Sequence, residues 1–221
     1  YAELEEWNPK TLLGFEKEAL GFFITGHPLD RYQGDLARWA TCSTADLGDR
    51  IQGGTQTLGG IVTDYKERLT KTGNKMAIFK LEDIWGQIEV VVFPKSFEKL
   101  GEVLKTDEPL LCTGKLEDEG EDGSHAFKMF LDEASPLARL RQEKTSRVHI
   151  LLNADNSSEA QLQELKALLA AHKGGCTTFL HLKIPKRSET VIPLRGLEVA
   201  PSDDFLLRVE RLLGERTVLL R

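Results

Sequence analysis

The stretch KMAIFKLEDIWGQIEVVVFPKSFEKL, residues 75–100, decides the fold of the central part of the chain. Its segments KMAIFKLED and IEVVVF alternate in the manner of half-buried strands, and the WGQ between them indicates a turn. The following PKSFEKLGEVL predicts a short helix, because Pro94 suits a first helical position and Phe97, Leu100 and Leu104 share one face. The stretch therefore predicts strand, strand and helix in this order.

Further strands are predicted on both sides of this stretch. The run LGGIVTDYKERL at 58–69 is rich in β-branched residues, and its paired glycines allow a sharply coiled strand. After the helix, PLLCTGKL at 109–116 and HAFKMFLDEA at 125–134 predict two more strands, separated by the polar loop EDEGEDGS. Five strands with one helix between the third and the fourth is the plan of the OB-fold, a small Greek-key barrel. We therefore predict an OB-fold nucleic-acid-binding domain over residues 57–134.

The first part of the chain, residues 1–56, predicts a helical connector followed by a linker. Asn8 and Pro9 suit a helix start, since asparagine caps the helix and proline lacks an N–H that has no partner there. Gly26 can take the left-handed conformation that ends a helix, and Pro28 prevents its continuation. The rest of this segment shows no regular pattern and predicts an irregular linker.

The last part of the chain, residues 145–221, predicts a domain with strands and helices in the order βαββαβ. Ser158 and Gln161 can form a capping box, and Ser202 can cap a second helix that ends at Gly214. This order favours an open α/β domain. The whole chain is therefore predicted to be α+β and multi-domain, with an N-terminal helical segment before the barrel.

Composition sets limits on the class of protein. The chain has 221 residues and a formal net charge of -6, which argues against a uniformly basic nucleic-acid binder but not against a local basic stripe. Cys42, Cys112 and Cys176 are odd in number and far apart, which fits a reducing, cytoplasmic compartment. No apolar run approaches the ~18 residues of a membrane span, so we expect no membrane partner. The chain starts at Tyr1, and we expect it to be a fragment of a longer protein.

Charge is unevenly distributed over the predicted barrel. The segment 65–80 carries five basic residues and one acid, Glu67, whereas residues 117–122 carry five acids and no base. In an OB-fold, single strands cross strands 2 and 3 between two flanking loops, so the basic segment lies where phosphates are expected. The candidate phosphate-binding residues are Lys66, Arg68, Lys71, Lys75 and Lys80. The acidic segment weakens this expectation, and any binding should depend on salt.

Strand alternation also predicts which side chains face a bound strand. Lys80 and Glu89 should not both be buried, so we assign their faces to the outside of the barrel. Phe93 then joins the outer face as a candidate for base stacking, with Lys95 beside it. A plain structural role, with the lysines only solvating the barrel and Phe93 closing its rim, remains the alternative.

The sequence offers no catalytic or metal site. Adjacent carboxylates occur at 82–83, 132–133 and 203–204, but neighbours on a strand point to opposite faces, and the last pair suits a helix start. No hydrolase, phosphate-loop or metalloprotease motif is present, and the histidines and cysteines lack metal-ligand spacing. His27, beside Pro28, is expected to be structural. We predict no catalytic residue, no metal and no cofactor in this chain.

Three stretches carry a family resemblance. EKEALGFFITGHPLDRY (16–32), KTGNKMAIFKLEDIWGQIEVVVFPKSFEKLGEVLKTDEPLLCTGKL (71–116) and LEVAPSDDFLLRVERLLGERTVLL (197–220) resemble, in order, parts of the alpha subunits of bacterial replicative DNA polymerase III. The resemblance implies a C-terminal fragment of a DNA-directed DNA polymerase. The magnesium-binding carboxylates and the clamp-binding peptide of that family lie upstream, and no position here matches them. The segment around Phe15, Phe22 and Phe23 is then expected to pack on the missing body and to be loosely attached here.

The resemblance also implies partners. The barrel would contact the single-stranded DNA template, and the last domain would bind the tau subunit of the clamp loader. Other subunits of the holoenzyme would bind the missing parts. Two alternatives stay open: an OB-fold RNA-binding module of an aminoacyl-tRNA-synthetase-like enzyme, whose barrels share such strands, and a barrel that only binds protein.

Overall fold

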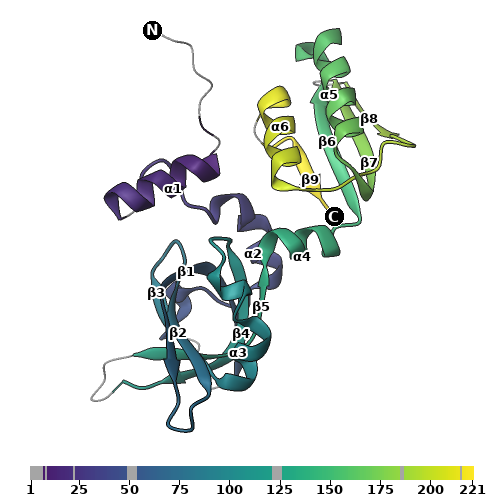
Figure 1. The fold of residues 1–221 in the computed structure, drawn as a ribbon. Helices are drawn as coiled ribbons and strands as arrows, with labels where there is room; N and C mark the ends of the chain where they lie inside the picture. Colours follow the sequence, from purple (N-terminus) through teal and green to yellow (C-terminus); the bar gives the residue numbers. More distant parts are fainter. Residues whose placement is uncertain are drawn as a thin grey trace. The chain divides into compact units, whose positions relative to one another are not determined.

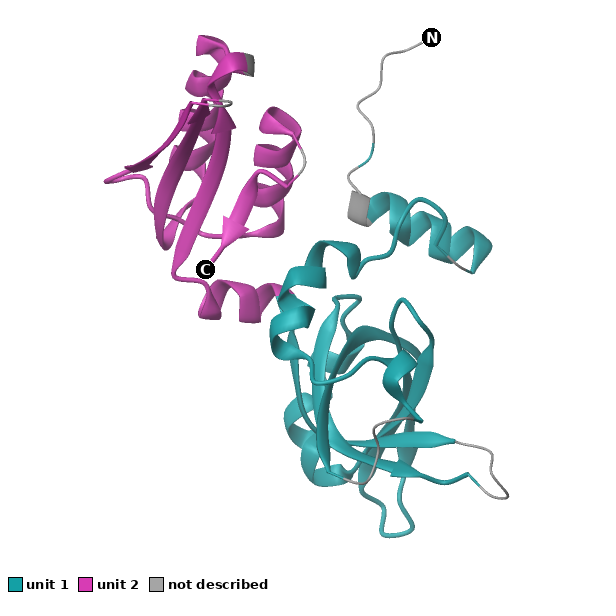
Figure 2. Ribbon diagram, turned by 180° about the vertical axis from the view of Figure 1, so that it is seen from behind, with its two compact units in different colours: residues 1–137 teal, residues 138–221 magenta. Residues whose placement is uncertain are grey.

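A computed structural model describes residues 7, 9–21, 23–48, 54–120, 126–184, 187–214 and 216–221. The chain divides into two compact units, residues 1–137 and 138–221 (Figures 1 and 2). Asn8 and Phe22, which entered the sequence-based expectations, lie outside the described residues. No helix of the described part is long and apolar enough to cross a membrane.

Unit 1 contains a closed five-stranded barrel with the strand order β1-β2-β3-β5-β4 (Figure 1). The strands are β1 (Thr55–Leu69), β2 (Lys75–Glu82), β3 (Gln87–Val92), β4 (Leu110–Asp118) and β5 (Phe127–Pro136). Helix α3 (Pro94–Leu100) and the short 3-10 helix η3 (Val103–Lys105) connect β3 to β4. The predicted order of five strands and one helix is confirmed, and Pro94 opens the helix as expected.

The barrel closes because β1 is long enough to pair with two strands. Its first half pairs with β4 as far as Gly60, and its second half pairs with β2 from Ile61 onward. A side chain at Gly60 would place its Cβ 2.6 Å from Leu81 Cγ, so only glycine fits where β1 changes partner. Ala77, Phe79 and their neighbours on β2 and β3 fill the interior, which confirms the predicted inward face.

The N-terminal part of unit 1 is more regular than the sequence predicts. Helix α1 (Pro9–Leu20) ends at Leu20 rather than at Gly26, because Gly21 adopts the left-handed conformation with φ 81°. Helix α2 (Gln33–Trp39) and 3-10 helices η1 (Asp30–Tyr32) and η2 (Thr44–Asp46) form where a linker was expected. Tertiary contacts stabilise these short helices: Leu29 and Tyr32 are buried, and η2, which also has a local capping box of Ser43 and Asp46, is hydrogen-bonded to the barrel.

Asp83, at the β2–β3 turn, attaches η2 to the barrel. Its carboxylate accepts hydrogen bonds from the backbone N–H and hydroxyl of Thr44, and from the backbone N–H groups of Trp85 and Gly86. Helix α1 is attached more lightly. It buries Leu13 and makes an ion pair from Lys17 to Glu82, while Phe15 stays 45% exposed, as expected for a loosely packed helix.

Unit 2 has a four-stranded sheet in the order β8-β7-β6-β9 (Figure 1). Its strands are β6 (Arg147–Asn153), β7 (Lys173–Ile184), β8 (Ser188–Pro193) and β9 (Val218–Leu220), and its helices are α5 (Glu159–Ala171) and α6 (Asp203–Leu213). The predicted βαββαβ order is confirmed. The short 3-10 helix η4 (Ala154–Asn156) follows β6, and α4 (Leu137–Lys144), which the sequence did not predict, precedes it.

Local capping signals in unit 2 are confirmed. Ser158 and Gln161 form the capping box of α5, Ser202 accepts from the N–H of Phe205 at the start of α6, and Gly214 ends α6 with φ 103°. Both helices pack on one face of the sheet, where their apolar side chains meet those of β6 and β7. The buried residues of this core are Val148, Ile150, Leu165, Leu169, Cys176, Val199, Phe205 and Val209.

Candidate nucleic-acid interface

The outside of the barrel carries a row of side chains that crosses all five strands. Directly opposed residues share a face, and the register places Lys66 of β1 beside Ile78 of β2, and Ile78 beside Val91 of β3. Val91 is next to Phe130 of β5, because β3 and β5 pair in parallel, and Phe130 is next to Lys115 of β4. The row is therefore apolar in its centre and basic at both ends.

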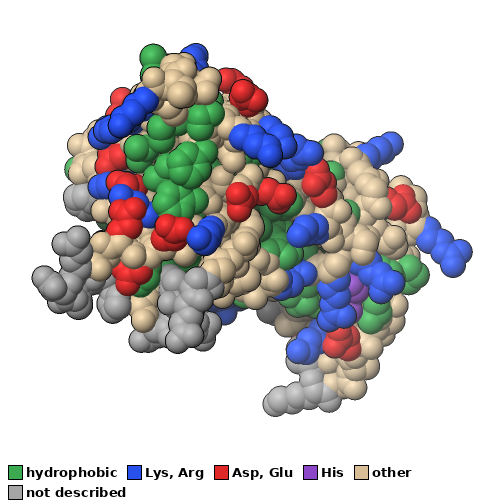
Figure 3. Space-filling view, turned by 90° about the horizontal axis from the view of Figure 1, so that it is seen from below, with side chains coloured by type: hydrophobic (Ala, Val, Ile, Leu, Met, Phe, Trp, Pro, Cys, Tyr) green, Lys and Arg blue, Asp and Glu red, His purple; other side chains and the backbone are tan. Residues whose placement is uncertain are grey.

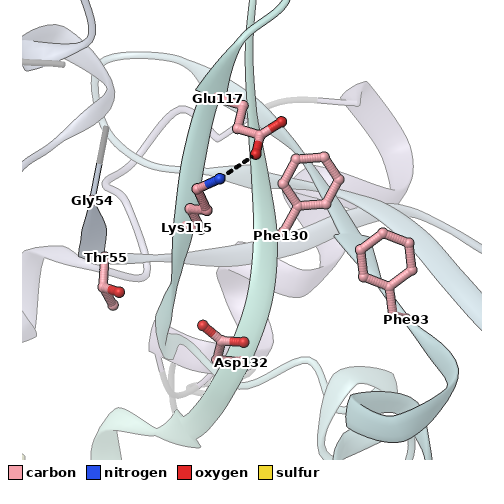
Figure 4. Close-up of a pocket in the computed structure, with 7 residues that line it drawn as sticks. All are labelled: Gly54, Thr55, Phe93, Lys115, Glu117, Phe130 and Asp132. Atoms are coloured by element: carbon pink, nitrogen blue, oxygen red, sulfur yellow. Dashed lines mark hydrogen bonds and ion pairs between the residues drawn. The ribbon is translucent and has the colours of Figure 1, made fainter. Parts of the chain in front are cut away.

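Two aromatic rings stand together at this apolar centre. Phe93, which directly follows β3 and is 51% exposed, lies parallel to Phe130, with ring centroids 5.5 Å apart and an interplanar angle of 3° (Figure 4). They line an open depression of about 650 Å³. Its remaining lining residues are Gly54, Thr55, Lys115, Glu117 and Asp132. An exposed aromatic face in an open depression can accept a nucleobase by stacking.

The seven residues predicted to bind nucleic acid do not all share this face. Lys66 and Arg68 lie on it, opposite Ile78 and Met76, and so does Lys80. Lys71 is exposed in the turn between β1 and β2.

Lys75 and Lys95 lie elsewhere. Lys75 lies on the same side of β2 as the inward Ala77. It lines a different depression beside α3, together with Glu67 and Lys105. Lys95 is exposed in the first turn of α3. The structure thus brings Lys66, Arg68, Lys80 and Phe93 to one face and separates Lys75 from them.

Internal ion pairs occupy several cations of this face. Lys80 Nζ lies 3.0 Å from Asp64, and Lys115 Nζ lies 2.6 Å from Glu117 (Figure 4). The hydrogen bond and charge of Lys80 lower the pKa of Asp64. Asp64 sits at the irregularity of β1 with φ 51°, just before the basic segment begins. Acidic and basic side chains are interspersed around the hydrophobic ones on the surface that Figure 3 presents.

The acidic segment is also tied to the barrel wall. Lys128 of β5 pairs with Glu119 and with Glu89 of β3, and its hydrogen bonds to these two carboxylates raise its pKa. Residues 121 and 122 of the segment lie outside the described part of the chain. In the described part of the segment, Glu117 therefore pairs with Lys115 of β4 and Glu119 with Lys128 of β5.

Phe130 and Lys115 were not among the residues predicted from the sequence. A signal was present, because Met129 and Leu131 are apolar neighbours that must face the interior, which turns Phe130 outward. What the sequence does not contain is the parallel pairing of β3 with β5 that places Phe130 beside Phe93.

Four of the six adjacent carboxylates singled out from the sequence have structural partners. Glu82 pairs with Lys17, and Asp83 organises its turn. Asp203 pairs with the buried Arg141, and Asp204 with Arg208. Within the described residues, no group of three or more His, Cys, Asp or Glu side chains could hold a metal ion.

The barrel also matches a known class of domain. Residues 56–137 match the sequence family described as OB-fold nucleic acid binding domain, whose short name refers to the tRNA anticodon. The barrel of unit 1 is thus an OB-fold of the nucleic-acid-binding class.

Over its whole length, the chain is homologous to curated proteins named DNA polymerase III subunit alpha. It is 29% identical over 221 residues to that of Bacillus subtilis, covering 100% of this chain and 19% of the relative. It is 31% identical over 224 residues to that of Saccharopolyspora erythraea, covering 98% of this chain and 18% of the relative. The chain thus spans about a fifth of the length of these relatives.

One solved structure that aligns with the chain is a mitochondrial single-stranded DNA binding protein from S. cerevisiae, Rim1. It has 10% sequence identity and a TM-score of 0.32, and the alignment covers 38% of this chain and 95% of that chain.

Proposed function

We propose that this chain is a non-catalytic, C-terminal part of a bacterial DNA polymerase III alpha subunit, and that its barrel holds single-stranded DNA. The observation that carries the proposal is the parallel pair of Phe93 and Phe130 at the centre of the outer row. Homology along the whole chain and the nucleic-acid-binding class of the barrel support it.

The arrangement suits a single strand better than a duplex. A base can stack on the exposed face of Phe93 only when it is unpaired, and such stacking contributes about 1–3 kcal/mol per base. The phosphates on one side of that base would meet Lys66 and Arg68, with Lys71 in the adjoining turn. Because few cations contribute and several are already paired with acids, binding should be weak and sensitive to salt.

The remaining roles are proposed from the resemblance to the alpha subunits of DNA polymerase III, which the homology supports. The catalytic, magnesium-binding carboxylates would lie in the part of the polymerase that this chain does not span, so this chain would need no metal of its own. Unit 2 would bind the tau subunit of the clamp loader, and further holoenzyme subunits would bind outside this chain.

Fluorescence anisotropy with labelled oligo-dT tests the DNA role. We expect binding at about 50 mM salt that falls as salt rises, with a slope of about -0.7 in log K per phosphate contact on a single strand. A duplex of the same length should bind more weakly, because its bases are stacked within the helix. No binding of oligo-dT at low salt would remove the DNA role of the barrel.

An RNA-binding role is the second candidate, favoured by the anticodon-related name of the matching family. It predicts that a structured RNA hairpin displaces oligo-dT at equal concentration. If oligo-dT instead stays bound in an excess of the hairpin, the RNA role is excluded and the single-stranded DNA role is retained.

A further inference from the structure

The sheet of unit 2 has one face that its own helices do not cover. Helices α5 and α6 pack on the side of Val148 and Ile150, so the alternate residues of each strand point to the other side. The register places Leu219 of β9, His149 of β6, Phe179 of β7 and Pro193 of β8 in one row across this second face. Leu151, His181 and Val191 form the next row. We call this surface the open face.

Polar groups at the centre of the open face are linked by hydrogen bonds, while His149 Nε2 is buried without a hydrogen-bond partner. His149 Nδ1 lies 2.8 Å from His181 Nε2, and His181 Nδ1 lies 2.7 Å from a carboxylate oxygen of Glu189. The His149 ring also stacks on Phe179, with centroids 5.0 Å apart. The centre of the open face is therefore ordered and largely apolar, with Leu219 43% exposed and Val191 49% exposed.

The margins of the open face are basic. Arg147 and Arg221 lie side by side at one end, joined by backbone hydrogen bonds, and Lys183 lies at the other, opposite Glu189. All three cations are exposed. Glu189 is the one acidic residue at the outward strand positions described here, and it is engaged by His181. The open face thus combines exposed aliphatic side chains with an excess of positive charge.

This combination fits protein better than nucleic acid. A strand of nucleic acid needs a track of cations and a free aromatic ring, but the cations here stand at opposite ends and the ring of Phe179 is already covered by His149. Aliphatic side chains between basic residues complement a segment that alternates acidic and apolar residues.

We infer that the open face of unit 2 is a docking surface for an acidic protein segment that also carries apolar side chains. The surface is argued from unit 2 alone. Only the identity of its natural occupant, the tau subunit, rests on the proposed function of the chain.

A peptide titration of the full chain tests the surface. The probes are two short synthetic peptides of equal length, one alternating glutamate and leucine, the other alternating lysine and leucine. We expect the acidic peptide to bind at least about tenfold more tightly, as complementary charge at an interface predicts. Arg147→Glu with Lys183→Glu should remove this preference, and Val191→Ser should weaken both peptides. Equal binding of the two peptides by the wild-type chain overturns the inference.

Two matched variants localise the effect. Lys166→Glu with Arg211→Glu makes the same change of charge at exposed positions of α5 and α6, and Lys71→Glu with Lys75→Glu makes it on the barrel. Both should keep the preference for the acidic peptide. Its loss in either one, or its persistence in the Arg147 and Lys183 variant, would show that the open face is not the site. Far-UV circular dichroism checks that each variant is folded.

A parallel titration with purified tau subunit separates this inference from the proposed function. If the wild-type chain does not bind tau, the proposed partner is wrong, while the peptide result still decides the open face. If tau binds equally to the wild type and to the Arg147 and Lys183 variant, the inference is wrong and the partner stands. Self-association seen by light scattering, or loss of oligo-dT binding in the open-face variant, would assign the face to a second copy or to DNA and overturn the inference.

Discussion

Lys80 and Asp64 form an ion pair on the outside of the barrel, with 3.0 Å between Nζ and a carboxylate oxygen. Asp64 directly precedes the basic segment, in a left-handed backbone conformation that asparagine also tolerates. The pair holds one of the predicted phosphate-binding cations on an internal acid.

Asp64→Asn should therefore strengthen single-stranded DNA binding, because it frees Lys80 without disturbing the backbone. We expect an affinity increase of about two- to threefold and a steeper salt dependence, both measured by anisotropy with oligo-dT. Asp107→Asn, an exposed acid before β4, removes the same charge away from the face and should have a smaller effect. Equal gains from both variants would mean that net charge alone is responsible.

The aromatic pair should supply binding energy that salt does not remove. Phe93→Ala and Phe130→Ala should each cost about 1–3 kcal/mol in oligo-dT binding, with an unchanged salt slope, because stacking involves no counterion release. Trp85→Ala is the control, since Trp85 is 68% exposed in the β2–β3 turn, at the other end of β3 from Phe93. A loss for Trp85→Ala as large as that for Phe93→Ala would place the bases elsewhere on the barrel.

The two faces of β1 and β2 should differ in their response to charge reversal. Lys66→Glu and Arg68→Glu change the outer face, and each should reduce the salt slope of oligo-dT binding by about 0.7, the value for one lost phosphate contact. Lys75→Glu changes the side that faces Glu67 and α3, and should leave the slope nearly unchanged. The opposite ranking would show that the strand runs over the α3 side.

Mild acid should destabilise both units through histidine. Burial, followed by the charges of His181, Arg221 and Arg147, lowers the pKa of His149, and burial also lowers the pKa of His27. An unfolded histidine titrates near its ordinary pKa of about 6.5, so below that pH the unfolded chain binds a proton that the folded chain does not. Stability is therefore lost as the pH falls from about 6.5 toward the folded pKa, with a slope of at most about 1.4 kcal/mol per pH unit for each group.

The two units can be followed separately. Trp7, Trp39 and Trp85 all lie in unit 1, so tryptophan fluorescence reports the part that contains His27. Amide hydrogen exchange of β6 reports the part that contains His149. His149→Gln should reduce the acid sensitivity of exchange in β6 and leave the fluorescence transition as it was. Unchanged exchange in that variant would contradict a role for His149.

Particular residues show which features of the structure could be predicted from the sequence. Alternation in KMAIFKLED and IEVVVF is a local property, and it correctly placed Phe79 and Val90 inside the barrel and Lys80 and Glu89 outside. Capping by Ser158 and Ser202 is equally local, because the donor and the acceptor are only three residues apart. Helix α2 was missed for the converse reason: what stabilises it lies in the barrel and in buried neighbours, not in its own sequence.

The sequence by itself determined the order of the strands and which side of each strand faces the core, since burying every other side chain is the dominant favourable term for such a chain. Only the tertiary structure decided which strands are neighbours. Closure of the barrel brings β3 beside β5, and thereby Phe93 beside Phe130, although 37 positions separate them along the chain (130 - 93). It likewise decided which cations remain available, because a pair such as Lys80 with Asp64 depends on distance in space rather than in sequence.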